Sequence, residues 1–497
     1  MWLVGNARTV AATRRSPNMS PSELHDPGMN PGGSKRMGSS SGAPERAGPG
    51  PVEGRAVTPD RVKEIMSKHL LTTGMMPLVL DMQRSRGVDL YDQATGKRYL
   101  DFFGFVASSV LGMNHPALTD DEDFNRRLRE AATNKVTNSD VATVHAARFV
   151  DTFDRVGIPP YLPYAFFISG GALAVENALK AAFDWKVRKN FAKGYGRELG
   201  SQVLHFEQAF HGRTGYTLSL TNTADPRKTS YFPRFDWPRV SSPRIIHPLA
   251  DHLERVVEAE ERAIAEAKQH FLERRDDIAA VIIEPIQGEG GDHHFRPEFL
   301  RQLRALAREN DALLVFDEVQ TGVGITGRFW AHQAMDVEPD LIAFGKKTQV
   351  CGVLAGRRMD EVEGHVFETP GRLNSTWGGN LVDMVRFERI LEVMEETELV
   401  SGVEALGARL LERLRELETE FAAVESARGR GLMCAFDLPD GASRDAVIRA
   451  CFDNGVAILG SGSRSIRFRP PLIITPEEID RGVDLIADAI AKAAPGA

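Results

Sequence analysis

Between about residues 110 and 345, short apolar segments alternate with longer amphipathic segments, and this alternation constrains the fold more than any other feature. Strands that alternate with helices are typical of a mostly parallel sheet covered by helices on both faces. Ligands bind such sheets beyond the carboxyl ends of the strands. The sequence therefore predicts an α/β fold whose functional residues follow its strands. The expected strands are Ala165–Ile168, Gln202–Phe206, Ala279–Ile283, Ala312–Phe316 and Leu341–Phe344, and the expected helices between them are Ala174–Val187, Leu253–His270 and Pro297–Asn310.

The segment before this region divides into a polar extension and the start of folded sequence. Residues 1–55 are rich in Gly, Pro and Ser and carry Trp2 as their one aromatic residue, so we expect a disordered extension. A transit peptide, or translation from an internal start such as Met37, are the alternatives. A helix is expected to begin after Thr58, followed by a hairpin that turns near Gly96.

The segment after the alternating region predicts a smaller α+β domain. Helices are expected at Arg386–Glu396 and Val403–Thr419, and the stretch Arg428–Phe436 resembles the entry to a strand. We therefore expect a large domain at residues 111–385 and a small C-terminal domain at residues 386–497, and we expect the N-terminal segment 56–110 to join the small domain.

Composition excludes several classes of protein. The chain has 61 Lys and Arg against 69 Asp and Glu, a net charge of −8, so it lacks the basic excess of a nucleic-acid binder. Its three cysteines are far apart, which excludes a disulfide scaffold or zinc ribbon and favours a cytoplasmic protein. No apolar run is long enough to cross a membrane, so we expect no membrane span.

The first two expected strands end in residues suited to an anionic, flat ligand. Ser169-Gly170-Gly171 stands between a strand and a run of helix formers, and free N–H groups at a helix start bind phosphate well. After the next strand, the ring of Phe210 could stack on a heterocycle, and Arg213 could bind a carboxylate with two hydrogen bonds. Taken singly, these residues are more typical of a tight turn, a core ring and a surface ion pair than of a ligand site.

The last three expected strands deliver charged residues to the same edge. Glu284 and Glu289 follow one strand, Asp317 ends another, and Lys346 and Lys347 follow the last. An acid placed there can bind a metal, cap a turn or hold a protonated ring nitrogen, and a desolvated lysine can act as a nucleophile. One cofactor explains all of these signals: pyridoxal 5′-phosphate needs an anion cradle, a stacking ring, an acid at its ring nitrogen and an imine-forming lysine.

The segments SGGALAVENALKAA, FHGR, EPIQGEGG, VFDEVQTGVGITGRFW and FGKK resemble the class III (ω-)aminotransferases of pyridoxal-phosphate fold type I, from about residue 75 to the C-terminus. That resemblance implies a large domain with a mostly parallel seven-stranded sheet flanked by helices, and a small α+β domain. It also implies a homodimer that shares its active sites. The segments FFGFVASSVLGMNHP, FGKKTQVCGV and GRLNSTWGGNLVDMVR resemble the members that act on L-lysine, although Thr348–Gly352 stands where other members have small residues and a Gly pair.

The resemblance also assigns cofactor-binding roles. Asp317 would hold the ring nitrogen protonated, Lys346 would form the imine, and Thr376 would reach the phosphate bound by the neighbouring subunit. Lys347 is the alternative to Lys346; because side chains alternate in an extended segment, only one of the two is expected to face the cofactor. The remaining cofactor contacts would come from the N–H groups of Gly171 and Ala172, the ring of Phe210 and the amide of Gln320.

The expected reaction moves the ε-amino group of L-lysine to 2-oxoglutarate, with Lys346 as general base. The family has a Glu–Arg switch for its two substrates, and the resemblance implies that Glu289 neutralises an arginine while lysine is bound and releases it to bind the α-carboxylate of glutamate. The family motif assigns that arginine to Arg467, with Arg469 as the alternative on the same strand face. Arg213 would bind the distal carboxylate, and Asn374 would contact the substrate. Transfer from ornithine, acetylornithine or 4-aminobutyrate, and a cofactor-binding protein without catalysis, are the alternative functions.

Overall fold

The computed structural model describes residues 57–493, so the expected N-terminal extension lies outside the described residues. The chain divides into two units, one up to Val79 and one from Leu80 onward. In the first unit, a 3₁₀ turn η1 (Pro59–Arg61) leads into α1 (Val62–Ser67). Thr58 is the N-cap residue, as predicted, but its backbone carbonyl accepts the N–H of Arg61 and its side chain forms no capping hydrogen bond.

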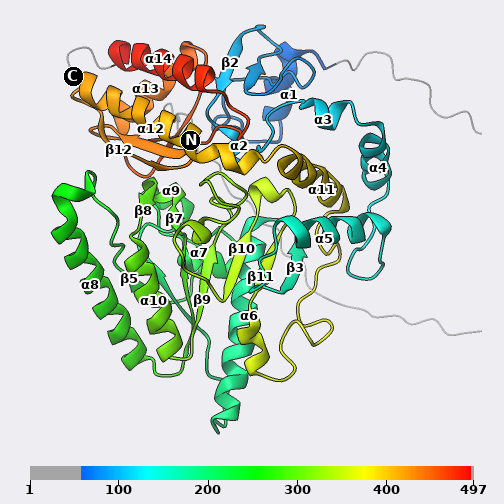
Figure 1. Cartoon of the computed structure of the whole chain (residues 1–497), viewed down its shortest axis with the longest axis vertical. Helices are drawn as coiled ribbons and strands as arrows, with labels where there is room; N and C mark the ends of the chain where they lie inside the picture. Colours follow the sequence, from blue (N-terminus) through cyan, green and yellow to red (C-terminus); the bar gives the residue numbers. More distant parts are fainter. Residues whose placement is uncertain (1–56, 494–497) are drawn as a thin grey trace, which may run out of the picture. The chain divides into compact units, whose positions relative to one another are not determined.

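The second unit is built on a seven-stranded sheet (Figure 1). The strand β11 (Cys351–Ala355) runs antiparallel to both of its neighbours, and all other neighbouring pairs of strands in this sheet are parallel. The predicted α/β fold class is confirmed, and each of the five predicted strands is present with its ends shifted by at most one residue. In spatial order the strands are β3 (Tyr164–Ile168), β11 (Cys351–Ala355), β10 (Leu341–Phe344), β9 (Leu313–Asp317), β6 (Ile278–Ile283), β4 (Gln202–Phe206) and β5 (Arg239–Val240).

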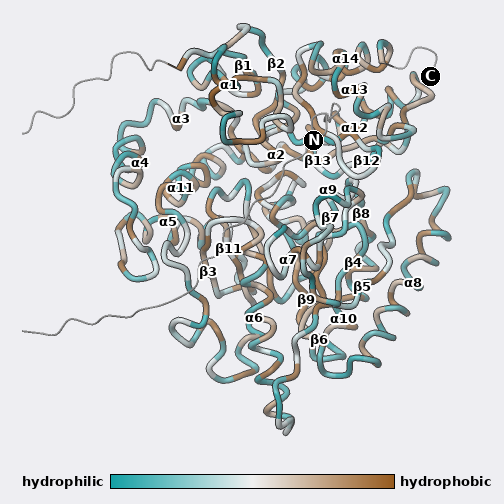
Figure 2. Tube along the Cα trace, turned by 180° about the vertical axis from the view of Figure 1, so that it is seen from behind, coloured by the Kyte–Doolittle hydropathy of each residue, from teal (hydrophilic) through white to brown (hydrophobic). Residues whose placement is uncertain are grey.

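Helices cover both faces of this sheet. Successive side chains of a strand point to opposite faces, so strands that are apolar throughout present apolar side chains to both. Leu313 belongs to the apolar core that the sheet forms with α6 (Gly171–Ala192). On the other face, the ring of Phe206 meets the ring of Phe299 of α10 (Pro297–Glu309) at 5.9 Å between centroids. The strands are therefore buried on both sides, and hydrophobic colouring gathers along them, while the outer helix α8 (Leu249–Glu273) alternates between hydrophobic and hydrophilic stretches (Figure 2).

Two further sheets belong to the flanking segments. One pairs β1 (Asp89–Tyr91) with β2 (Arg98–Asp101) in the predicted hairpin, and β2 pairs in parallel with β14 (Val456–Ala457) from the C-terminal part. In the other sheet, the stretch Arg428–Phe436 is part of a hairpin that turns at Gly431, and a strand begins within it at Met433, as the expected strand entry requires. That sheet holds β12 (Glu425–Arg430), β13 (Met433–Asp437), β16 (Ser465–Phe468) and β15 (Leu459–Ser461), with helices α12 (Val403–Glu420), α13 (Gly441–Asp453) and α14 (Pro476–Ala493) in the same part of the chain.

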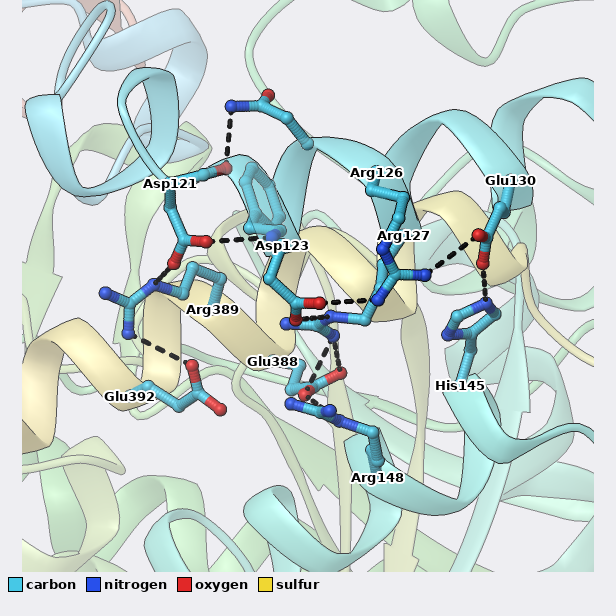
Figure 3. A network of polar contacts seen from close by, with 12 residues as sticks. Asp121, Asp123, Arg126, Arg127, Glu130, His145, Arg148, Glu388, Arg389 and Glu392 are labelled. Carbon is cyan, nitrogen blue, oxygen red and sulfur yellow. Dashed lines mark hydrogen bonds and ion pairs between the residues drawn. The ribbon is translucent and has the colours of Figure 1, made fainter.

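A buried ion network joins three helices beside the large sheet: α4 (Glu122–Thr133), α5 (Val144–Val156) and α11 (Leu381–Glu396) (Figure 3). Glu388 of α11 accepts hydrogen bonds on both carboxylate oxygens from Arg127 of α4, at 3.0 Å each, and one from Arg148 of α5 at 2.9 Å. A buried carboxylate requires such charged partners, so the network fixes how the three helices pack.

Three findings on the described residues bear on the class of protein. None of the helices within residues 57–493 is both long enough and apolar enough to span a membrane. In the same part of the chain, no group of His, Cys, Asp and Glu is arranged to hold a metal ion. The cysteines Cys351, Cys434 and Cys451 are all free and buried, so each is a small apolar core residue here.

Candidate functional site

Asp317 ends the central strand β9 and is almost fully buried. One carboxylate oxygen lies 2.8 Å from Nδ1 of His211, and the other accepts the N–H of Val319 at 3.0 Å. Two anchors fix the orientation of this acid, as expected for a group that must face one atom of a ligand. His211 belongs to the FHGR segment, so the sequence places it near the site, although the sequence reasoning assigned it no role.

The two consecutive lysines after β10 have different environments. Lys347 is fully buried, and its Nζ donates to the carbonyls of Ala107 at 3.1 Å and Gln320 at 3.0 Å. Lys346 is half-buried; burial lowers its pKa, the charge of Arg467 lowers it further, and Asp317 opposes both effects. Lys346 therefore lies among the charged groups of the site, whereas the amine of Lys347 is bound to backbone carbonyls.

The expectation that the two lysines lie in an extended segment was wrong. Residues Lys346–Thr348 form a 3₁₀ turn and not an extended segment, and Lys346 has a left-handed φ of 56°. Side chains in such a turn do not alternate between two faces. A non-glycine residue in this conformation is strained, and such strain concentrates at functional sites.

Glu289 lies between two cations. Its Oε2 is 2.9 Å from Nη1 of Arg467, and its Oε1 accepts a hydrogen bond from Nζ of Lys228 at 2.5 Å. Burial alone would raise the pKa of Glu289, but Arg467 and Lys228 together hold it below its usual value. The carboxylate is therefore charged and paired, with the geometry expected of Glu289 and Arg467. The sequence analysis did not identify Lys228, because it ends a three-residue 3₁₀ turn that no strand, motif or spacing marks.

Arg469 makes contacts different from those of Arg467. Its guanidinium is buried, forms an ion pair with Asp292 and donates from Nε to Oε1 of Gln320 at 2.9 Å. Gln320 is further confined by Gly288, where an added Cβ would lie 2.4 Å from the Gln320 side chain. Arg469 is thus bound to an acid and an amide, whereas Arg467 is the arginine that meets Glu289.

Phe210 is held at its backbone by a second buried acid. Glu284 accepts the N–H of Phe210 at 2.8 Å and that of Gly288 at 3.1 Å. Burial and then the nearby charge of Asp317 raise the pKa of Glu284 well above its usual value. Glu284 therefore acts through the loop that carries Phe210, a role that the sequence reasoning did not assign.

The start of α6 offers uncapped donors. Its N-cap residue is Gly170, with φ of 111°, and no side chain caps the helix. An added Cβ on Gly171 would lie 2.9 Å from Cγ1 of Val319, so the glycine allows the helix start to approach the loop after β9. The first N–H groups of a long helix have no partner within the helix, and without a capping side chain they are suited to bind a phosphate.

Three predicted site residues are exposed on the single chain. They are Arg213, Asn374 and Thr376. Within the described residues, none of their side chains joins the ion pairs around Glu289 and Asp317. The structure therefore gathers Asp317, Glu289, Lys346 and Arg467 but leaves these three available to a substrate or a second subunit.

These residues fit pyridoxal phosphate. A buried, oriented acid at Asp317 suits a protonated ring nitrogen, and a lysine with a lowered pKa at position 346 suits imine formation. The uncapped helix start at Gly171 suits the phosphate, and Phe210, whose backbone N–H donates to Glu284, supplies a ring that can stack on the cofactor. The donor set thus supplies one group for each part of the cofactor.

Comparisons with known proteins agree with this chemistry. The model of the family described as Aminotransferase class-III matches residues 71–490. An L-lysine-epsilon aminotransferase of Mycobacterium tuberculosis is 56% identical over 440 residues, which are 88% of this chain and 97% of that protein. One from Streptomyces clavuligerus is 50% identical over 436 residues, which are 87% of this chain and 94% of that protein.

A solved structure gives the same result in three dimensions. The lysine aminotransferase from M. tuberculosis in the internal aldimine form superimposes with a TM-score of 0.86 and 55% sequence identity, covering 88% of this chain and 100% of that chain. Family model, sequence relatives and fold thus agree over most of the length. The chain belongs to the class III aminotransferases, which are enzymes that depend on pyridoxal 5′-phosphate.

Proposed function

We propose that this enzyme transfers the ε-amino group of L-lysine to 2-oxoglutarate, giving L-glutamate and 2-aminoadipate 6-semialdehyde, which cyclises to a piperideine carboxylate. The relatives at 50–56% identity carry the name L-lysine-epsilon aminotransferase. The observation that carries the proposal is the pairing of Glu289 with Arg467 at 2.9 Å, close enough to Lys346 for both charges to shift its pKa. Such a pair lets one site accept a neutral methylene in one half-reaction and a carboxylate in the other.

The residues divide the chemistry between them. Bound pyridoxal phosphate supplies an aldehyde for the amine and a protonated ring that withdraws electrons. Asp317, oriented by His211, would hold the ring nitrogen of the cofactor in its protonated form. Lys346 Nζ takes a proton from Cε of lysine, and its lowered pKa favours the neutral amine that can do so. Phe210 and the helix start at Gly171 orient the flat ligand.

The Glu289–Arg467 pair selects between the two substrates. With lysine bound, Glu289 neutralises Arg467, so the methylene next to the reacting carbon meets no uncompensated charge. With glutamate or 2-oxoglutarate bound, Glu289 leaves and Arg467 binds the α-carboxylate, while the exposed Arg213 takes the distal one. Asn374 contributes a further substrate contact. The two half-reactions therefore alternate at one site and predict ping-pong kinetics.

We also infer a homodimer with shared active sites. Thr376 is exposed on the single chain, which suits a hydroxyl that binds the cofactor phosphate in a neighbouring subunit. The parallel pairing of β2 with β14 supports a small domain built from the hairpin segment and the C-terminal part, beside a large domain at residues 111–385. Three free, buried cysteines suit a reducing compartment such as the cytoplasm.

A donor panel tests the proposed function. The purified enzyme is loaded with cofactor and supplied with 2-oxoglutarate and one amine at a time: lysine, ornithine, acetylornithine or 4-aminobutyrate. We expect lysine to give the highest kcat/KM, with the cyclised semialdehyde and glutamate formed in equal amounts. Good turnover of ornithine or 4-aminobutyrate with poor turnover of lysine would refute the assignment, and no half-reaction with any amine would indicate a protein without catalysis.

A further inference from the structure

Glu289 has a second cationic partner, Lys228. The proposed exchange, in which Arg467 pairs either with Glu289 or with a substrate carboxylate, assigns no role to this lysine. Each carboxylate oxygen has its own partner, Oε1 facing Lys228 and Oε2 facing Arg467. The side chains of Lys228 and Arg467 are 16% and 6% exposed, and that of Glu289 is 24% exposed. A salt bridge so far removed from solvent is only weakly screened by water.

The two contacts of Glu289 differ in kind. Lys228 donates a hydrogen bond of 2.5 Å to Oε1. Arg467 is near enough for an ion pair at 2.9 Å, yet its buried Nη1 has no hydrogen-bond partner within the described part of the chain. Glu289 can therefore separate from Arg467 and keep its one charge-assisted hydrogen bond, and Arg467 has a donor left for a ligand.

Lys228 is placed to act at the site. It closes the 3₁₀ turn η2 (Pro226–Lys228), which is capped by the side chain of Asp225, and the Lys228 N–H donates to the Asp225 carbonyl at 3.2 Å. Its Nζ lies 5.7 Å from the centroid of the Phe210 ring, so the same ammonium group contacts both Glu289 and the face of the ring. A short, capped turn thus directs this lysine to the carboxylate.

The charges at the site show why it needs Lys228. When Arg467 turns to the α-carboxylate of the diacid, Glu289 would lose its counter-ion while a second anion arrives beside it. A mostly buried carboxylate without a partner is strongly disfavoured, so without another cation Glu289 would stay on Arg467 and exclude the diacid. Lys228 is already bound to the other oxygen and needs no rearrangement to serve.

We propose that Lys228 is the positioning residue that holds Glu289 while Arg467 binds the α-carboxylate of the diacid, so that Lys228 controls the 2-oxoglutarate half-reaction and not the lysine half-reaction. The proposal rests on the proposed function, because it concerns the exchange between its two substrates. Lys228 acts through Glu289 and makes no contact of its own with the diacid.

The experiment measures the two half-reactions and diacid binding separately. Lys228→Met removes the ammonium group, Lys228→Arg keeps a cation, and Lys268→Met is a matched control because Lys268 is an exposed lysine of α8. Holoenzyme is mixed with lysine, and the aminated form with 2-oxoglutarate, while cofactor absorbance is followed. Binding of glutarate, an unreactive diacid, to the holoenzyme is measured by calorimetry, and thermal unfolding shows that each variant is folded.

We expect Lys228→Met to weaken glutarate binding and slow the 2-oxoglutarate half-reaction by about 10- to 100-fold, the range expected for a lost hydrogen bond to a charged group. The lysine half-reaction should change little, Lys228→Arg should restore most of the diacid affinity, and Lys268→Met should match the wild type. Equal losses in both half-reactions, or unchanged glutarate binding, would overturn the proposal.

A double variant distinguishes a Lys228 that positions Glu289 from a Lys228 that binds the diacid directly. In Glu289→Ala there is no carboxylate to hold, so adding Lys228→Met should leave glutarate binding unchanged. A further loss in that background would make Lys228 a direct ligand of the diacid and overturn the proposal. Glutarate binding does not depend on the identity of the amine, so failure of lysine as donor and failure of this proposal are separate results.

Discussion

Two carboxylates of this enzyme each meet two cations, but the two arrangements serve opposite purposes. Glu388 binds Arg127 through both oxygens and Arg148 through one, and its side chain is 1% exposed (Figure 3). Glu289 meets Lys228 and Arg467 through one oxygen each, and its side chain is 24% exposed. The first is fixed by several hydrogen bonds at a helix junction, and the second by one hydrogen bond and one ion pair.

This difference shows how similar ion pairs can fix the packing of helices in one place and allow a change of partner in another. Separating Glu388 from Arg127 would leave each of these two buried ions with one exposed partner, Arg148 for Glu388 and Asp123 for Arg127, which is a poor replacement for the pair. Separating Glu289 from Arg467 leaves Glu289 bound to Lys228 and the arginine open to an incoming carboxylate. A second partner on the other oxygen is what makes the exchange inexpensive in free energy.

The largest effect is expected at Lys346, where a substitution should lower activity greatly and stability little, the opposite of a substitution in the structural network around Glu388. Lys346→Ala should lower turnover by about 10⁴-fold or more, since it removes both the imine-forming amine and the general base, while the thermal midpoint changes little. Borohydride treatment of the wild-type holoenzyme followed by peptide mapping should place the cofactor on Lys346. A label on Lys347, or activity in the alanine variant, would reverse the assignment.

The next effect compares the two carboxylates directly. Glu388→Ala should lower the free energy of unfolding by about 3–5 kcal/mol, because Arg127 is left buried without its main partner. The lysine half-reaction of the remaining folded enzyme should survive. Glu289→Ala is the matched variant: it should slow the lysine half-reaction, in which Arg467 stays unmasked, with a much smaller loss of stability. If both variants lost stability equally, the distinction would fail.

Sequence reasoning predicts those parts of the molecule that follow from local pattern. Asp317 and Lys346 were predicted because each lies at the end of an apolar strand, and parallel strands bring such residues to one edge. The pairing of Arg467 with Glu289 came from the family motif. The uncapped start of α6 could be read from a strand, two glycines and a helical run.

The rest depends on contacts between distant segments. Nothing near Lys228 in the sequence indicates that its loop returns to Glu289, and nothing near Arg127 indicates its pairing with Glu388. The 3₁₀ turn at Lys346 was missed, because two lysines after a strand give no local signal of a left-handed residue. Tertiary packing determines these features, and single-sequence patterns do not contain it.

A third buried carboxyl shows what happens without cations. Asp101 accepts only the N–H groups of Phe103 and Gly104 among the described residues, and burial raises its pKa to about 7. The native state then binds more protons than the unfolded state between about pH 4 and 7, so stability should fall as pH rises through this window. Asp101→Asn should remove about 1–3 kcal/mol of that fall, measured by unfolding at several pH values. An unchanged pH profile would contradict this.

The smallest effect is expected at the rim of the structural network. Arg148 donates one hydrogen bond to Glu388, but its side chain is 46% exposed. Arg148→Ala should therefore cost only about 0–1 kcal/mol of unfolding free energy, because Arg127 still binds both oxygens. A loss as large as that of Glu388→Ala would mean that Arg148, and not Arg127, holds the junction.

The most direct test of the contrast between the two carboxylates is a crystal structure of the holoenzyme with glutarate bound. We expect Arg467 on a carboxylate of the ligand, Glu289 separated from Arg467 but still hydrogen-bonded to Lys228, and Glu388 unchanged between Arg127 and Arg148. Glu289 still paired with Arg467 while glutarate occupies the site, or Lys228 bound to the ligand in place of Glu289, would contradict the account.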